Sequence, residues 1–471
     1  MKQLEDNQAN DLSQMIDKAT KEELAALVEK HVNTDDKFRY EVLSALGSTV
    51  AQELAAAKEL ITSSIRSNTN RGYINYRGCD DICCDMDTVV ENAKRRNRRG
   101  QYAEAIDLSL YIVLAAAKLA SQADSSSGAL SFTLEDALKV IDESTAAIRD
   151  EERAQTDARK VLDRILKTAR NKAFDGWEEW RYALLCSAAR ICDTKSAEKL
   201  VAYLDQQLVQ LKDEGHLRDF YAALDVETRY CIKRTIEGKE AARHFLNAYL
   251  ALDSIRELAV HEDMADGRYD NAERLCLERE REDVARSSMQ PRRWNYLLYE
   301  IYTDAGQKEK QIAQAQKLFL LGDMSYYDKL KTLLIENDRW AIAYPKLMEM
   351  VKEKQSYYYY MRLLDKEGET ALLMEQLRMH QELVFDYAEH LSGAYADEIY
   401  PMCEKLIRRE APTFSDRKGY RRLCSMLLFL SNIGGTAHAL SLLAALRENN
   451  PRRPAMLDEL NKAERKMWKR V

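Results

Sequence analysis

The sequence predicts an all-α protein, an α-solenoid of degenerate helical hairpins of the tetratricopeptide (TPR) or HEAT type. The first observation behind this prediction is the placement of proline. Only six prolines occur among 471 residues, and the first of them is Pro291. A long proline-free stretch that is rich in Ala, Leu, Glu, Lys and Arg favours helices, because proline interrupts a helix and these residues propagate one.

The second observation is a local pattern that recurs around glycines. The pattern G-x-Y-x-x-A-x-x-L at residues 100–108 returns at residues 267–275 and, more loosely, from Gly435 to residue 443. Degenerate copies occur at residues 238–242 and 338–343. From residue 253 onward the expected turns are Gly267, Gly306, Asp338, Gly368 and Gly434. Apart from a larger last gap, they are about 30 to 40 residues apart, which is the period of helical-hairpin repeats.

Composition and charge narrow the class of protein. The formal net charge is −7 with 32% charged residues, so the overall field does not attract nucleic acid. The N-terminus lacks the pattern of a signal peptide, and the longest apolar run, at residues 110–117, ends at Lys118. Nine cysteines, an odd number in a large chain, indicate reduced thiols, and those at helical positions, Cys186 and Cys231 among them, are expected to act as small hydrophobes. We expect a cytoplasmic protein without a membrane span or a cofactor.

The first part of the chain, residues 1–67, is predicted to be an N-terminal helical segment. Thr20 and Glu23 have the spacing of a capping box, which predicts a helix start. A second helix is expected from about residue 36 to residue 65. The polar segment S-N-T-N-R-G at residues 67–72 then closes this part of the chain.

Residues 71–250 are predicted to contain helical hairpins, beginning with one at residues 71–128. R-G-Y-I-N-Y-R comes first, and the following helix ends in K-R-R-N-R-R, where cations suit the helix dipole. Gly100 is expected to make the left-handed turn, and D-S-S-S-G at residues 124–128 is expected to form the loop that leaves the hairpin. Further on we expect a helix over residues 177–186 and a turn at residues 213–216.

Residues 251–471 are predicted to form C-terminal TPR-like repeats with a capping helix. The last hairpin is expected to pair residues 419–430 with residues 437–446 and to end at Asn449, Asn450 and Pro451. The basic terminal segment E-R-K-M-W-K-R-V is expected to cap the array.

Several segments resemble a known family. These are T-K-E-E-L at residues 20–24, R-G-Y-I-N-Y-R, and the terminal region that ends in R-R-P-A-M-L-D-E-L at residues 452–460. Together they resemble the helical region that follows the zinc finger in SWIM zinc-finger proteins. That finger needs a Cys-x-Cys pair and a later Cys-x-His, and neither is present here. The resemblance therefore implies a shared helical scaffold, and the zinc-dependent contacts of the family do not carry over.

The densest ligand-like cluster is Cys79, Cys83 and Cys84, flanked by aspartates. Thiolate and carboxylate groups hold zinc, and Cys79 and Cys83 share a helix face, so this is a weak candidate metal site. A closed zinc site needs four ligands, and no second pair is near. The alternative is a pair of buried thiols at the start of a helix.

The remaining candidates are surfaces for a partner or a phosphate. The basic run comprises Lys94, Arg95, Arg96, Arg98 and Arg99. The segment before the hairpin adds Arg71, Tyr73, Tyr76 and Arg77. A tyrosine run adds Tyr357, Tyr358, Tyr359 and Tyr360, which cannot all face one core because successive helix residues point about 100° apart. For any single tyrosine the alternative is a ring in the core with its hydroxyl at the rim.

These features favour a non-enzymatic helical-repeat scaffold that mediates protein–protein interaction with a protein or peptide partner. One alternative is a nucleic-acid-associated protein that uses the basic run beside a partner that supplies further DNA contacts. The other is an enzyme of unrecognised type, although the seven histidines are dispersed and no catalytic motif is evident. The sequence makes no prediction of oligomeric state.

Overall fold

The computed structural model describes residues 15–46, 49–150, 158–211, 217–285 and 293–468. Within these ranges every regular element is a helix, and bridged backbone is limited to Asn70 with Tyr73 and Ile74 with Ala123. The predicted all-α class is confirmed. The chain divides into two compact units, Met1–Leu275 and Cys276–Val471. Their boundary lies inside helix α14, whereas the sequence suggested one near residue 250.

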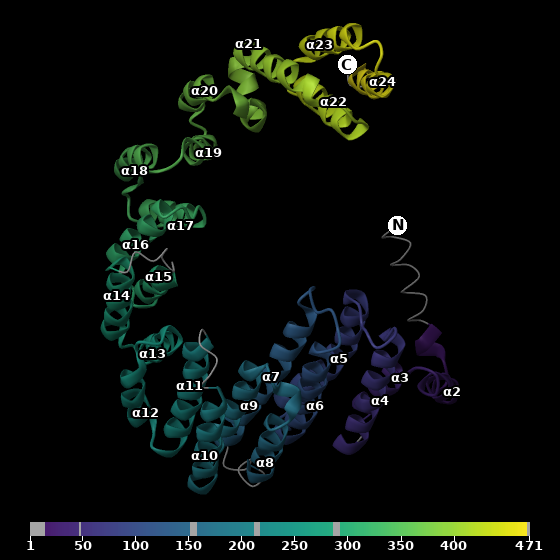
Figure 1. Cartoon of the computed structure of the whole chain (residues 1–471), viewed down its shortest axis with the longest axis vertical. Coiled ribbons are helices and arrows are strands. Elements are labelled where there is room, and N and C mark those ends of the chain that lie inside the picture. Colours follow the sequence, from purple (N-terminus) through teal and green to yellow (C-terminus); the bar gives the residue numbers. More distant parts are fainter. Residues whose placement is uncertain (1–14, 47–48, 151–157, 212–216, 286–292, 469–471) are drawn as a thin grey trace. The chain divides into compact units, whose positions relative to one another are not determined.

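Most helices of the first unit pack against helices that are near to them in the chain (Figure 1). They are α2 (Lys21–Val32), α3 (Asp36–Ala45), α4 (Val50–Asn68), α5 (Tyr76–Arg98), α6 (Tyr102–Ala120), α7 (Ala129–Asp150), α8 (Ala158–Ala169), η2 (Lys172–Phe174), α9 (Glu178–Ala189), α10 (Thr194–Leu211), α11 (Arg218–Ile236), α12 (Lys239–Leu246), η4 (Asn247–Tyr249), α13 (Asp253–Ala265) and α14 (Tyr269–Ala285), which runs on into the second unit. The turn expected at residues 213–216 lies outside the described residues.

The second unit is also built from successive helices. They are α15 (Arg293–Asp304), α16 (Lys308–Leu320), α17 (Ser325–Glu336), α18 (Trp340–Lys354), α19 (Tyr357–Glu367), α20 (Thr370–Met379), η5 (Gln381–Leu383), α21 (Val384–Glu410), η6 (Ala411–Thr413), α22 (Arg417–Asn432), α23 (Thr436–Asn449) and α24 (Pro454–Trp468). From α15 to α22 each α-helix packs against the next.

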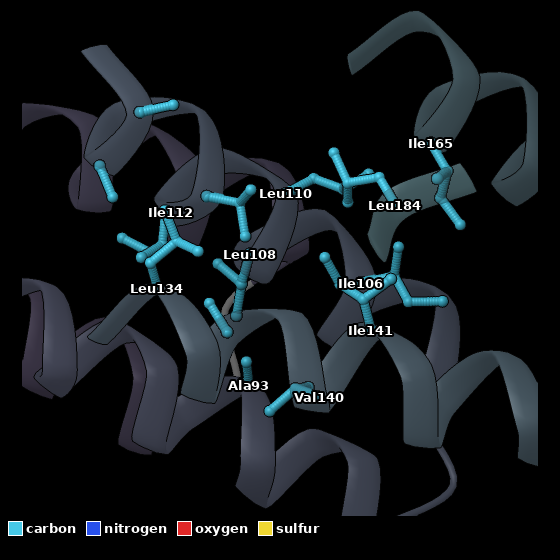
Figure 2. Close-up of a cluster of buried hydrophobic side chains, with 14 of the residues drawn as sticks. Ala93, Ile106, Leu108, Leu110, Ile112, Leu134, Val140, Ile141, Ile165 and Leu184 are labelled. Atoms are coloured by element: carbon cyan, nitrogen blue, oxygen red, sulfur yellow. The ribbon is translucent and has the colours of Figure 1, made fainter. Parts of the chain in front are cut away.

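Each unit has its own hydrophobic core. In the first unit α5, α6 and α7 all contact one another, and their apolar side chains meet those of α8 and α9 (Figure 2). The second of these, α6, contributes Ile106, Leu108 and Ile112, all fully buried. Beyond α7 the contacts join α7 to α9, α9 to α11 and α11 to α13, so alternate helices also touch. This near-neighbour packing is that of an α-solenoid.

The predicted turns share one geometry. The N–H of Gly100 donates to the carbonyl of Asn97 (3.0 Å), and the N–H of Gln101 donates to that of Arg96 (3.0 Å). This is the Schellman arrangement, which needs a left-handed residue at the turn. The same pair of hydrogen bonds closes the helices before the left-handed residues Gly267, Gly306, Gly322, Asp338, Gly368 and Gly434.

The fifth residue after the left-handed one packs into the hairpin. After the glycine turns it is buried in every case: Ala105, Ala272, Gln311, Tyr327, Leu373 and Ala439. The sequence interpretation began the last copy at Gly435, which is wrong by one residue. Gly434 is the left-handed residue (φ +105°), and the small side chain at the contact is Ala439, whereas Ala437 is exposed.

The structure also decides three expectations about single helices and turns. The single helix expected over residues 36–65 is in fact two helices, because Thr49 begins α4 with a capping box to Gln52. The large gap between Gly368 and Gly434 contains α20, α21 and α22, and within α21 Tyr395 has a non-helical backbone (φ −130°, ψ 31°). The expected terminal cap is present as α24, which packs against both α22 and α23.

Candidate functional site

The segment R-G-Y-I-N-Y-R forms a tight turn between α4 and α5. The N–H of Asn70 donates to the carbonyl of Tyr73 (2.9 Å), and the reverse bond is 3.1 Å. Arg71 (φ 52°) and Gly72 (φ 84°) are both left-handed, as the two central residues of a type I′ turn must be. Arg71 is one of two non-glycine residues with positive φ among the described residues, and a side chain there costs about 1 kcal/mol.

The residues after this turn anchor it to the hairpin. Ile74 is buried, and its backbone pairs with the loop after α6 through bonds to Gln122 (3.2 Å) and from Asp124 (2.9 Å). Asn75 then caps α5 by accepting from the N–H of Gly78 (2.9 Å). The loop predicted at D-S-S-S-G is therefore the element that holds the R-G-Y-I-N-Y-R segment in place.

Anchoring Ile74 leaves its neighbours on the surface. Tyr73 and Tyr76 are 54% and 45% exposed, and Arg71 and Arg77 are exposed as well. The Nε–H of Arg77 donates to the Tyr76 hydroxyl (2.9 Å), and its guanidinium carbon lies 5.6 Å from the centre of that ring. We call Arg71, Tyr73, Tyr76 and Arg77 together the Tyr73–Arg77 surface. It combines exposed aromatic rings and arginines, the residue types enriched at the centres of protein interfaces.

The basic run is divided between structural and exposed residues. Lys94 forms ion pairs with Glu91 (2.8 Å) and with Asp136 of α7 (2.6 Å), and hydrogen bonds to these carboxylates raise its pKa. Arg96 binds the buried Glu53 of α4 through Nε (2.9 Å). Both side chains therefore join helices.

The other three cations of the run are Arg95, Arg98 and Arg99, and all are exposed. They lie in the last turn of α5 and at its C-cap, where the sequence predicted helix-terminating cations. The exposed basic patch therefore contains three of the five cations in the run.

The three cysteines of α5 do not converge. Cys79 and Cys83 are fully buried, whereas Cys84 is exposed. Burial raises the pKa of Cys83 to about 12 and also raises that of Cys79, so both are protonated thiols at neutral pH. The described part of the chain contains no group of three or more His, Cys, Asp or Glu side chains placed to hold a metal ion.

The tyrosine run splits as helical geometry requires. Tyr357 and Tyr358 are 46% and 47% exposed, whereas Tyr360 is buried and the Tyr359 hydroxyl donates to the carbonyl of Phe319 (3.2 Å). The ring of Tyr357 stacks on His380 with centroids 3.8 Å apart. Other aromatic residues of this region, Trp294, Tyr302, Tyr326 and Tyr327, are buried. The prediction that part of the run reaches solvent is confirmed.

One feature was not recognised in the sequence. Cys186 of α9 and Cys231 of α11 are half-buried and line a groove of about 320 Å³ together with Arg190 and Glu227. From the sequence, both cysteines are expected to act as small hydrophobic residues. Because α9 packs on α11 with α10 between them in the chain, no local spacing could have paired them.

The fold places the chain in the class of all-α helical-repeat proteins, and comparison with known proteins goes no further. No protein-family model matches the sequence, and no curated protein matches it. One solved structure, described as a "Circular tandem repeat protein with novel repeat topology and enhanced subunit contact surfaces", aligns at 15% identity over 92% of this chain and 98% of its own, with a TM-score of 0.20. A likeness at that score carries no argument about function. Among the described residues, no helix is long and apolar enough to cross a bilayer.

Proposed function

We propose that this chain is a non-enzymatic helical-repeat scaffold that binds a protein or peptide partner through the Tyr73–Arg77 surface. The observation that carries the proposal is that four large polar-tipped side chains stand exposed on a backbone fixed at both sides. The type I′ turn and the pairing of Ile74 with residues 122 and 124 hold the backbone, so little conformational entropy is lost when a partner binds. Rings and guanidinium groups presented in this way are effective anchors at protein interfaces.

The test uses a matched pair of double variants in the full-length chain. Tyr73→Ala with Tyr76→Ala removes the proposed anchors, and Tyr357→Ala with Tyr358→Ala removes two tyrosines of similar exposure in the other unit. Each protein is used for affinity purification from native extract, and the affinity for any stoichiometric partner is then measured. We expect the partner to bind the wild type and the control alike. The anchor variant should bind at least about 30-fold more weakly, which corresponds to 2 kcal/mol.

Two results would contradict the proposal. One is a partner that binds the Tyr73/Tyr76 variant as tightly as it binds the wild type. The other is the recovery of no stoichiometric partner at all. Circular dichroism of both variants establishes that each has kept its helices.

A second function, association with nucleic acid, is favoured by the exposure of Arg95, Arg98 and Arg99. Three phosphate contacts would give a modest salt dependence, with log K falling by about 0.9 for each contact per decade of salt. Replacing the three arginines by alanine should abolish both the binding and this slope. Absence of binding by the wild type at low salt would exclude the function.

The resemblance to the helical region of SWIM zinc-finger proteins enters here as a proposal about ancestry. It is supported by the residue patterns and by the helical structure at both ends of the chain, where R-R-P-A-M-L-D-E-L leads into α24 and supplies buried Met456 and Leu460. We also propose a cytoplasmic location, supported by the odd number of cysteines, nine, in a large chain, which suits a reducing compartment. Partner proteins that carry a SWIM finger would strengthen the first proposal, and fluorescence microscopy of the tagged chain tests the second.

A further inference from the structure

The groove between α9 and α11 brings two thiols together, and we name them the groove thiols, Cys186 and Cys231. The Cys186 sulfur lies 3.3 Å from the Thr228 hydroxyl, which is one turn before Cys231 on α11. Cys186 is therefore directed at the face of α11 that carries Cys231. Both residues line one groove of about 320 Å³, and both are partly exposed.

The charges around this pair distinguish the two thiols. Arg190 lies one turn after Cys186 and is held by Asp142 of α7 through a 2.6 Å bond from its Nε. A hydrogen bond from Cys186 lowers the pKa of Cys231, and the positive charge of Arg190 acts in the same direction. The same hydrogen bond, with burial, raises the pKa of Cys186. Cys231 therefore ionises first.

Other titratable or charged groups lie around the two thiols. In addition to Asp142, Arg190 and Glu227, the groove is lined by Lys139 of α7 and by Glu179 and Tyr182 of α9. A smaller neighbouring cavity of about 80 Å³, which Cys231 also lines, adds Arg149 of α7, Tyr230 and Arg234 of α11, and Glu262 of α13.

A second pair of neighbouring thiols in the same chain provides a contrast. Cys79 and Cys83 lie one turn apart on α5, but both are fully buried and their pKa values are raised by burial. A buried thiol with a raised pKa is a poor nucleophile. Of these two pairs, only the groove thiols combine access, a neighbouring cation and a second thiol.

We propose that Cys231 and Cys186 form a redox-active dithiol that reacts with hydrogen peroxide and closes to a disulfide between α9 and α11. The Cys231 thiolate attacks one peroxide oxygen, so that an S–O bond forms and the O–O bond breaks. The departing hydroxide takes up a proton and becomes water, which leaves a sulfenic acid on Cys231. The Cys186 sulfur then attacks the Cys231 sulfur, the S–S bond forms, and a second water leaves with the Cys186 proton. Overall, two thiols are oxidised by two electrons and one peroxide is reduced to two waters.

The experiment exposes the full-length protein to hydrogen peroxide at neutral pH, blocks the remaining thiols with iodoacetamide, and maps the peptides by mass spectrometry without reduction. We expect a Cys186–Cys231 linked peptide to appear before any linkage of Cys79 to Cys83. The exposed Cys84 serves as the internal standard for an unassisted thiol. Only the monomer band of a non-reducing gel is digested, which excludes links between two chains.

Two variants test the assigned roles. Cys186→Ser should stop oxidation of Cys231 at the sulfenic acid, which a dimedone probe detects. Arg190→Gln should slow the modification of Cys231 several-fold relative to Cys84 in the same molecule, because a thiolate stabilised by the cation becomes less populated. Circular dichroism verifies that both variants have folded.

The proposal fails if peroxide leaves Cys186 and Cys231 individually alkylated while Cys84 is oxidised. It also fails if Cys79 and Cys83 are linked at the same rate as the groove thiols. A linked peptide whose rate of formation is unchanged by Arg190→Gln would refute the role of the cation.

Discussion

Arg95 and Arg96 are adjacent in the basic run, yet we expect their replacement by alanine to have very different effects on stability. Arg96 reaches back from α5 to α4, where its Nε lies 2.9 Å from Oε2 of Glu53. Glu53 is 1% exposed and Arg96 is 13% exposed. The other partner of the carboxylate is the Tyr40 hydroxyl, 3.3 Å from Oε1. Arg95 is exposed at the helix end.

The expected loss of stability follows from the buried Glu53 carboxylate, which Arg96→Ala leaves without its ion-pair partner. A buried carboxylate would keep only a long hydrogen bond to a tyrosine, and removing one partner of a buried ion pair costs roughly 3–5 kcal/mol. Because the guanidinium group of Arg96 is at the edge of the core, water can enter after its removal, and we expect a value near the lower end, about 3 kcal/mol. Arg95→Ala should change stability by less than about 0.5 kcal/mol, as is usual for exposed positions.

The assay is urea denaturation of both full-length variants followed by circular dichroism, with amide hydrogen exchange to locate the effect. Exchange should accelerate in α4 and α5 of Arg96→Ala and should be unchanged in the second unit. In the double variant Arg96→Met with Glu53→Gln, no unpaired buried carboxylate remains. Part of the stability that is lost in Arg96→Met alone should therefore be recovered. Equal stability of Arg95→Ala and Arg96→Ala, or recovery of nothing by Glu53→Gln, would refute the reasoning.

Three further predictions concern backbone, pH and redox state. Gly100→Ala should destabilise the protein by about 1–2 kcal/mol, because φ is +74° at that residue. Gly393 lies inside α21 with open space around it, so Gly393→Ala should stabilise the protein by about 0.5–1 kcal/mol. Melting temperatures that shift in the same direction for both variants would contradict this prediction. A hydrogen bond to Asp365 raises the pKa of the exposed His390. The contribution of this pair to stability is therefore complete below about pH 6.5, the pKa of histidine in the unfolded chain, and is lost as the pH rises through the raised pKa of the folded state. In a proton NMR titration, Asp365→Asn should lower the titration midpoint of His390, and an unchanged midpoint would exclude the pairing. A disulfide between the groove thiols would close a loop over residues 186–231, and the chain-entropy model gives a stabilisation of the first unit by about 4 kcal/mol. The melting temperature should therefore rise on oxidation and fall again when a reductant is added. A lower melting temperature after oxidation would show that the disulfide strains the native packing.

The local features of this fold could be predicted from the sequence because each depends on a few neighbouring residues. The capping box of Thr20 and the left-handed turns at Gly100 and Gly267 are set by side-chain and backbone chemistry within one helical turn. The errors were also local. The capping box at Thr49 was missed, and the last copy of the glycine pattern was started at Gly435, although the turn itself was correctly expected at Gly434.

Which of these residues are available for function was decided by the tertiary structure. Arg96 cannot be distinguished from Arg95 in the sequence, and only the packing of α5 on α4 places it against a buried carboxylate. Cys186 and Cys231 belong to helices separated by a third, and only the contact of α9 with α11 turns two ordinary cysteines into a pair. Helical periodicity by itself determined that this chain would form hairpins, because the pattern repeats over a few residues. The partners of each charged group and thiol depend on contacts between distant segments, which no local pattern records.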